Sequence, residues 1–227
     1  MAVTTSVLLL SGAGLPPWIW DQVRQHLPVA SAVAARATTP ASVGDHARAA
    51  LASAPQGDSL VLVAHSAGGV VAGEVTALAP GRVAAVLGVC AVVPAAGGSF
   101  TSSLPLPQRL LLPLVMRVAG TRPPESAVRR GLAAGLDEDT VERLLRDLTP
   151  EDRAYFTGRT QPGPPAPVRG YVTTADDAEL PPALQQRYLA RLAPTFRREL
   201  PGGHLPMLLH PRELAAAISE FVDGHVR

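Results

Sequence analysis

The chain has 227 residues, which is enough for one ordinary domain with a full hydrophobic core. Hydrophobic residues make up 47% of it, and 20 Lys+Arg stand against 19 Asp+Glu. This balance argues against nucleic acid or an acidic membrane surface as a partner. Every basic residue is Arg, so no lysine is available to a mechanism. The single cysteine, Cys90, excludes an internal disulfide.

The first residues, MAVTTSVLLLSG, lack the basic region of a secretory leader. Their apolar run, residues 7–10, is too short for a leader or a membrane span. We therefore expect a soluble, cytoplasmic protein.

The first half of the chain alternates short aliphatic runs with helix-like segments. Four runs lack a polar face, as parallel strands covered by helices on both sides do: residues 6–10, 29–35, 60–64 and 84–92. Helical patterns lie between them, at residues 18–27, 43–54 and 69–79. Ser42 and Asp45 have the spacing of a capping box at the start of the second helix.

The same alternation returns near the end of the chain. Strands are predicted at residues 168–173 and 195–200, and helices at residues 182–192 and 211–222. Strands that alternate with helices predict a parallel α/β sheet with right-handed crossovers. We expect a single α/β domain over residues 1–227, with about six mostly parallel strands.

Residues 94–166 interrupt this alternation. The segment begins with a leucine-rich part that prolines interrupt, the last of them Pro113. One amphipathic helix with a turn follows, and then a stiff return linker, QPGPPAPVRG. The segment is either a helical excursion packed on the domain or a small helical lid. Residues 104–118 carry more apolar surface than a solvated loop, which favours a lid. Arg109 and Arg117 disfavour a membrane helix.

The stretch AHSAG, residues 64–68, places Ser66 in a tight turn between a predicted strand and a predicted helix. The usual pattern of such a turn is G-x-S-x-G, in which a strained backbone lifts a nucleophilic hydroxyl above the sheet edge. Gly68 keeps the pattern, and Ala64 replaces the first glycine with the smallest side chain that could intrude. On this motif alone, a serine that only caps the helix stays an alternative.

A serine nucleophile needs a base, and the base needs an orienting carboxylate, in the chain order Ser, acid, His for this architecture. Asp176 and Asp177 follow one late strand, and His204 follows the other. Loops beyond the carboxyl ends of parallel strands are where open α/β sheets place their sites. His65, directly before Ser66, is expected to point away from the site as a packing residue. The other histidines are interpreted as surface, terminal or pre-proline residues: His26, His46, His210 and His225.

The tetrahedral intermediate of acyl transfer also needs hydrogen-bond donors for its oxyanion. One predicted donor is the backbone N–H of Ala67, directly after the serine, and the other should come from the loop SGAGLPPWIW after the first strand. The sequence carries neither a Cys/His ligand cluster nor a phosphate-binding loop. We therefore expect no metal and no organic cofactor.

Together these residues resemble the α/β-hydrolase fold family, in the branch of plant methyl-salicylate and methyl-jasmonate esterases, hydroxynitrile lyases and their bacterial relatives. The loop from Ser11 to Trp20 is similar to that branch's HGAxxGxWxW, which implies the N–H of Ala13 as the second oxyanion donor. GGHLPMLLHPREL is similar to its GGHMPMLSHPxEL, which implies His204 as the catalytic base.

The resemblance also bears on the two aspartates. The segment YVTTADDAELPPALQQR is similar to the branch's acid segment, in which Asp stands four residues before Pro and eight before Gln. Measured from Pro181 and Gln185, that residue is Asp177, with Asp176 as the fallback.

Two departures from the branch lie in the first part of the chain, and a third follows the expected catalytic histidine. Ser11 replaces a His and is expected to loosen or reshape the oxyanion loop. Residues 28–39 are shortened, so that rim should be more open. Leu205 stands where the lyases carry a Lys after the catalytic His. We expect the substrate pocket to be lined from the first loop and the lid, by Gly12, Leu15, Trp18, Leu111 and Leu114.

The sequence thus predicts a serine hydrolase of a small, largely apolar carboxylic ester, thioester or lactone. Two alternatives stay open: a lyase or other proton-transfer catalyst on the same fold, and a ligand-binding protein on a hydrolase scaffold. A serine at the elbow, in place of an Asp, disfavours the epoxide hydrolases and dehalogenases of the fold. The expected partner is a small ester-like molecule, with neither nucleic acid nor membrane, and a homodimer stays open.

Overall fold

The computed structural model describes residues 5–38, 40–57 and 59–226, so residues 1–4, Thr39, Asp58 and Arg227 lie outside it. Within these residues the centre of the molecule is a six-stranded sheet, in the order β2-β1-β3-β4-β5-β6, whose neighbouring strands are all parallel. The strands are β1 (Thr5–Leu10), β2 (Ser31–Val33), β3 (Ser59–His65), β4 (Val83–Val89), β5 (Val168–Thr174) and β6 (Phe196–Leu200). The predicted fold class is confirmed.

The strand order places two of the predicted site segments side by side. β1 and β3 pair along the whole length of β1, from Thr5 opposite Ser59 to Leu10 opposite Ala64. From β1 the chain runs to one edge of the sheet at β2, and after β3 on the other side of β1 it runs through β4 and β5 to the opposite edge at β6, so the direction reverses between β1 and β3. The loop after Leu10 and the turn after β3 therefore begin next to each other, at the switch point where open α/β sheets hold their ligands.

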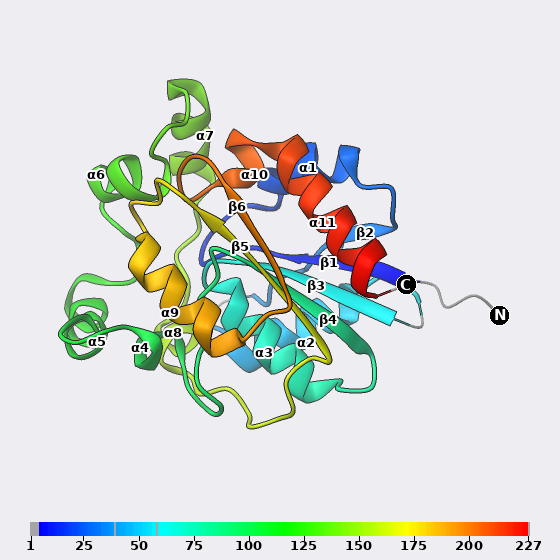
Figure 1. Ribbon diagram of the computed structural model, residues 1–227. Helices are drawn as coiled ribbons and strands as arrows, with labels where there is room; N and C mark the ends of the chain where they lie inside the picture. Colours follow the sequence, from blue (N-terminus) through cyan, green and yellow to red (C-terminus); the bar gives the residue numbers. More distant parts are fainter. Residues whose placement is uncertain (1–4, 39, 58, 227) are drawn as a thin grey trace.

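Helices cover both faces of the sheet (Figure 1). One face carries α1 (Asp21–His26) and α11 (Pro211–His225), and the other carries α2 (Val43–Ser53), α3 (Gly68–Leu78) and α9 (Pro182–Leu192). An apolar cluster fills each side, because the strand side chains alternate between the two faces. This accounts for the near-continuous apolar runs of the central strands.

The local predictions agree with the structure apart from some element ends. The capping box at α2 is present, with the Ser42 N–H donating to Asp45 Oδ2 at 2.8 Å and the Asp45 N–H to Ser42 Oγ at 3.3 Å. The helix predicted at 18–27 begins as a 3₁₀ turn, η1 (Pro17–Trp20), and β2 is shorter than the predicted 29–35. β2 is an edge strand, paired on one side only, and this limits its length.

Residues 94–166 form short helices, most of them beyond the ends at which the strands stop (Figure 1). The helices are α4 (Phe100–Ser103), α5 (Gln108–Ala119), α6 (Glu125–Ala127), the π-helical turn η2 (Val128–Leu132), α7 (Glu138–Asp147) and α8 (Arg153–Thr157). The prediction that Pro113 interrupts the leucine-rich part was wrong, because α5 runs through it. α5 is largely exposed, so water can take up the Arg109 carbonyl that Pro113 leaves without a donor.

Candidate active site

Ser66 stands at a strained turn between β3 and α3. Its φ of 52° lies in the left-handed region, which costs a residue with a side chain roughly 1–3 kcal/mol. Backbone hydrogen bonds hold the strain: the Ser66 N–H donates to Val89 O at 3.2 Å, and the Val92 N–H donates to Ser66 O at 2.9 Å. A Cβ on Gly68 would lie 2.7 Å from Leu10 O, so only glycine lets α3 start this close to β1.

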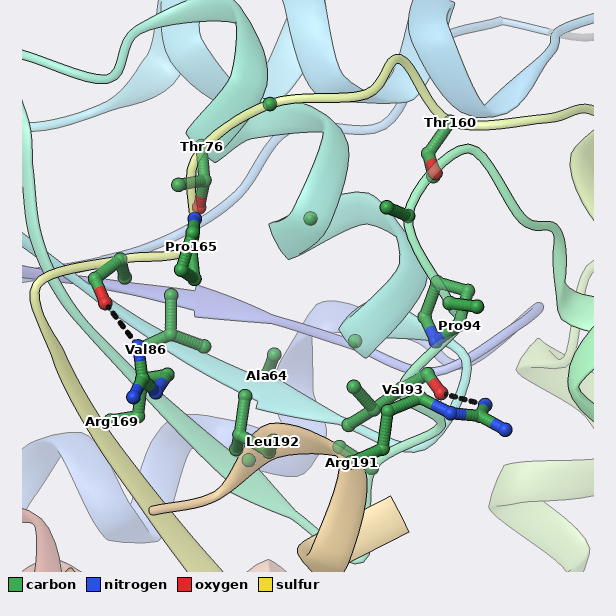
Figure 2. A pocket seen from close by; sticks show the side chains of 18 of the residues that line it. Ala64, Thr76, Val86, Val93, Pro94, Thr160, Pro165, Arg169, Arg191 and Leu192 are labelled. Atoms are coloured by element: carbon green, nitrogen blue, oxygen red, sulfur yellow. Dashed lines mark hydrogen bonds between the residues drawn. The ribbon is translucent and has the colours of Figure 1, made fainter. Parts of the chain in front are cut away.

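Ala64 occupies the position of the first glycine in the usual elbow pattern. Its side chain lines a cavity of about 270 Å³ under α3, with walls from β4, α9 and the linker that returns from residue 160 (Figure 2). The methyl group therefore has space, and the replacement leaves the turn intact. Ser66 is not among the residues that line this cavity. The cavity therefore lies behind the elbow, away from the Ser66 hydroxyl.

His204 connects Ser66 to Asp177 through its two ring nitrogens. Nε2 is 2.9 Å from Ser66 Oγ, and Nδ1 is 2.7 Å from Asp177 Oδ2. Because an ionised carboxylate only accepts hydrogen bonds, Nδ1 carries the proton and Nε2 is left to accept from the serine hydroxyl. His204 and Asp177 are buried, whereas Ser66 is partly exposed. The three predicted triad residues meet in the geometry of a base poised on a nucleophile.

The two neighbouring aspartates have different surroundings. Asp177 is buried and accepts from the Leu180 N–H at 2.7 Å and the Thr174 hydroxyl at 3.1 Å, besides its bond with His204. Asp176 is exposed and accepts from the Gly202 N–H at 3.2 Å. The Gln185 amide donates to Leu180 O at 2.8 Å and to the loop around Asp177. This contact explains why the acid of the motif is accompanied by a Gln eight residues after it.

The surroundings of the pair favour the charge separation that a triad needs. Burial works to raise the pKa of the Asp177 carboxyl, but the hydrogen bond and charge of His204, with the Leu180 N–H, hold that pKa below its ordinary value. Burial works to lower the pKa of His204, whereas the hydrogen bond and negative charge of Asp177 raise it above its ordinary value. Burial also raises the pKa of the Cys90 thiol, which keeps it uncharged at neutral pH. Asp177 therefore favours its anionic form beside His204.

The two predicted oxyanion donors flank the serine. Ala67 follows Ser66 as the N-cap of α3, where the helix dipole adds positive potential. On the other side, a Cβ on Gly12 would lie 2.9 Å from Ser66 Cβ, so Gly12 brings the loop after β1, with Ala13, directly against the nucleophile. Ser11 accepts from the Trp20 indole N–H at 3.0 Å and so anchors the loop where relatives carry a His.

Two distant residues, Arg36 and Glu151, clamp this oxyanion loop. The Arg36 guanidinium donates to Gly12 O at 3.0 Å and to Leu15 O at 3.4 Å, and it pairs with the buried Glu151 carboxylate. Glu151 in turn accepts from the Gly14 N–H at 3.1 Å. The shortened segment 28–39 thus supplies a cation to the loop, and residues 94–166 supply its anion.

The sequence reading was wrong for His46 and wrong in part for His65, which is a buried packing residue as expected. His65 does not point away from the site: its Nε2–H donates to His204 O at 2.8 Å, and the two ring centroids are 4.8 Å apart. Burial lowers the pKa of His65 to about 3, so it stays neutral. His46 is buried, not on a helix surface, and it packs against Tyr155 and Glu151. Long-range packing sets both burials, and neither leaves a local signal in the sequence.

The predicted substrate-lining residues divide into three groups. Gly12 lies at Ser66, as described above. Leu15 is buried in the core, and Trp18 donates its indole N–H to Asp147 at 2.9 Å, which ties the first loop to α7. Leu111 and Leu114 lie on the outer side of α5 with 53% and 59% of their side chains exposed, because Met116 supplies the buried side of that helix.

Among the described residues, His65, Cys90 and His204 form the group of side chains close enough to share a metal ion. Both ring nitrogens of His204 are bonded to Ser66 and Asp177, and Nε2 of His65 is bonded to His204 O. The arrangement is that of a hydrogen-bonded support behind the base, and its donor set does not suit a cation.

Comparison with known proteins places this site in a family. The model of the Alpha/beta hydrolase family matches residues 7–217, so the chain belongs to the α/β-hydrolase family. A curated Mycobacterium tuberculosis protein named Probable oxidoreductase EphD is 30% identical over 50% of this chain and 21% of its own length. The chain spans about a fifth of that relative.

Solved structures similar in fold include the plant methylesterases that the sequence resembles. The methylesterase MES16 from Arabidopsis has a TM-score of 0.76 at 17% identity, over 97% of this chain and 100% of that one. An extracellular α/β-hydrolase from a Paenibacillus species has a TM-score of 0.79 at 15% identity, over 99% and 100%. A pyrethroid hydrolase from Sphingobium faniae JZ-2 has a TM-score of 0.63 at 23% identity, over 98% of both.

Proposed function

We propose that the protein is a serine esterase that uses Ser66, His204 and Asp177 as a catalytic triad. The observation that carries the proposal is the shared imidazole of His204, with Nε2 2.9 Å from Ser66 Oγ and Nδ1 2.7 Å from Asp177 Oδ2. The elbow supports it, because its strained φ of 52° presents the hydroxyl at the sheet edge. A pure ligand-binding protein would have no use for this arrangement.

In the acylation step, Ser66 Oγ attacks the carbonyl carbon of the ester while Nε2 of His204 takes its proton. The backbone N–H groups of Ala13 and Ala67 donate to the oxyanion of the tetrahedral intermediate. Asp177 holds Nδ1–H and stabilises the imidazolium without taking its proton. The imidazolium then protonates the leaving alkoxide oxygen, which departs as the alcohol and leaves an acyl-Ser66.

Deacylation repeats the same steps with water as the nucleophile. Nε2 of His204 takes a proton from the water as its oxygen attacks the acyl carbon, and the same two backbone donors hold the second oxyanion. Return of the proton to Ser66 Oγ releases the carboxylic acid. Burial of His204 and Asp177 keeps solvent from competing for the hydrogen bonds that drive both steps.

The substrate class in this proposal is a small, largely apolar carboxylic ester, thioester or lactone, with residues 94–166 as the lid. Proteins similar in fold are named esterase, methylesterase and pyrethroid hydrolase, which supports an ester. The alternative of a hydroxynitrile lyase is disfavoured because Leu205, fully buried, stands where those enzymes carry a Lys. An Arg is a poor replacement for an ammonium group, and the chain has no Lys.

A substrate panel tests the proposal. Purified protein is incubated with p-nitrophenyl acetate, butyrate and octanoate and, separately, with mandelonitrile. We expect turnover of the short acyl esters, no cyanide above background, and a loss of kcat by roughly 10³ or more in Ser66→Ala. Cyanide release with silent esters would reverse the assignment to a lyase.

A further inference from the structure

The strongly exposed large hydrophobic side chains of the described residues all lie in or next to one helix, α5. Between 53% and 82% of each is exposed, and together we call them the α5 face: Leu106, Leu110, Leu111, Leu114, Val115 and Val118. Single exposed hydrophobic residues are ordinary on a protein surface, whereas a contiguous group of this kind marks a site of contact.

The arrangement of α5 is the reverse of an ordinary surface helix, whose apolar side faces the core. Leu110, Leu114 and Val118 follow one another at spacings of four residues, so they form one line along the helix, and that line faces solvent. The fully buried side chain of α5 is Met116, which attaches the helix from its other side. The apolar stripe is therefore available to a partner while the helix stays attached.

The α5 face continues into a groove of about 790 Å³ between α5 and α9. Leu111 and Val115 line it from α5, and Leu184 and Arg187 line it from α9. An apolar chain end that approaches the stripe would therefore find a further apolar recess beside it. In Figure 1, α5 stands away from the sheet, with α4 and α9 beside it.

Positive charges predominate around the stripe. Arg117 lies three residues after Leu114, which puts it at the edge of the stripe, and Arg187 stands across the groove. Residues 100–124 contain no acidic residue, and Glu179 is the acid among the residues that line the groove. Among the described residues, no ion pair engages Arg117 or Arg187.

We propose that the α5 face docks on the surface of an anionic lipid bilayer. An exposed apolar stripe bordered by arginines is the pattern of helices that lie in the plane of a membrane interface. At 12 residues α5 is about 18 Å long, too short to span a bilayer, so it would lie along the surface. In a two-fold dimer through the same face, each copy would bring the arginines of residues 100–124 and no acidic residue from that segment, which disfavours that occupant.

This docking is independent of the proposed esterase activity, so a binding measurement separates the two. Protein is mixed with vesicles of phosphatidylcholine alone or with 30 mol% phosphatidylglycerol (a mixture of roughly physiological surface charge), and the vesicles are sedimented. The Ser66→Ala variant is carried alongside the wild type. We expect both to bind the anionic vesicles equally and the neutral ones at least tenfold more weakly, with added salt lowering the binding.

Three variants change the net charge by the same two units and differ in location. Leu110→Asp with Val118→Asp removes apolar surface at the stripe, Arg117→Glu reverses charge at its edge, and Arg212→Glu on α11 is the matched control. We expect the first two to lose binding to anionic vesicles by tenfold or more and the control to keep it. Turnover of p-nitrophenyl acetate and the circular dichroism spectrum should stay unchanged in all three.

Two results would overturn the proposal. One is equal loss of binding in Arg212→Glu, which would mean attraction by net charge alone. The other is that the protein does not bind anionic vesicles. Sedimentation equilibrium then shows whether it is a monomer or a dimer, and whether Leu110→Asp with Val118→Asp dissociates that dimer. The dimer would assign the α5 face to a second copy of the chain.

Discussion

At the scale of single residues, the account depends on one imidazole ring that makes two short hydrogen bonds in a buried site. His204 is able to accept a proton from Ser66 because Asp177 both fixes its tautomer and stabilises its charged form. His65 adds a third constraint by holding the backbone carbonyl of His204. The base is therefore positioned by side chain and main chain together.

Asp177→Asn and Asp176→Asn separate the roles of the two aspartates. We expect Asp177→Asn to lower kcat by roughly 10²–10⁴ through the wrong imidazole tautomer, and Asp176→Asn to cost little. The base must be neutral, so activity rises as pH passes upward through the pKa of His204. Asp177 raises that pKa, and its removal should move the rising limb of kcat/KM to lower pH.

The measurement is a pH profile of ester hydrolysis for both variants, with circular dichroism as a check of folding. The reverse ranking of the two variants would move the acid to Asp176. Equal small losses would mean that neither aspartate orients the base.

At this scale the sequence predicted the residues that belong to motifs and missed those that depend on packing. Ser66 follows from the elbow pattern, and the spacing to Gln185 selected Asp177 because the Gln185 amide holds the acid loop. Arg36 and Glu151 are 115 positions apart, and no local pattern connects them. The role of Glu151 appears only once residues 94–166 are folded against the first loop.

At the scale of elements, the oxyanion loop is the part of the site with the fewest side-chain signals and the most backbone contacts. Gly14 has a φ of 71°, and a Cβ there would lie 2.4 Å from Thr149 O. The Thr149 N–H also donates to Gly14 O at 3.0 Å. The loop is thus held on one side by the backbone of Thr149 and by Glu151, and on the β2 side by Arg36.

Variants of Glu151 test whether this clamp positions the oxyanion donors. Glu151→Gln keeps an acceptor for the Gly14 N–H, whereas Glu151→Ala removes it and leaves Arg36 without its partner. We expect Glu151→Ala to lower kcat roughly tenfold or more, with KM little changed, because a misplaced donor weakens transition-state binding. Glu151→Gln should recover most of that loss.

Thermal unfolding of both variants provides the control for this comparison. The carboxylate of this pair is buried and its guanidinium is partly exposed, so breaking the pair lowers stability and both variants should unfold at lower temperature. If kcat follows stability alone and Glu151→Gln recovers nothing, the clamp supports the fold and does not position the donors.

Helices and strands could be predicted from the sequence where their hydrophobic periodicity is clear. The orientation of an element was harder to predict where it depends on which side is exposed to solvent. The central strands and the capped helix α2 follow directly from apolar runs and from Ser42 with Asp45. α5 was harder, because a leucine-rich segment predicts a buried helix or a pocket lining. Its outward orientation depends on which neighbours cover it, and the sequence of the segment does not contain them.

At the scale of the whole molecule, net charge and mean composition describe the protein poorly. Its formal net charge is +1, yet residues 75–124 contain four arginines and no acidic residue. A balanced total therefore does not exclude a local apolar surface edged by arginine, such as the α5 face with Arg117. Within the described part of the chain, no helix combines the length and the apolar character needed to cross a bilayer.

The whole-molecule arrangement also explains why the site is assembled from distant segments. Ser66 follows β3, Asp177 follows β5 and His204 follows β6, and the parallel sheet brings all three strand ends to one edge. Because the strands share one direction, side chains more than a hundred residues apart in the sequence come within hydrogen-bond distance of one another. The family match over residues 7–217 agrees with this organisation.

The central claim is that Ser66 is a nucleophile activated by its buried neighbours. The most direct measurement is labelling with a fluorophosphonate probe at neutral pH, followed by mass spectrometry of the labelled peptide. We expect one adduct, on Ser66, which is absent in Ser66→Ala and strongly reduced in His204→Ala. Labelling that survives in Ser66→Ala, or an adduct found on another residue, would contradict it.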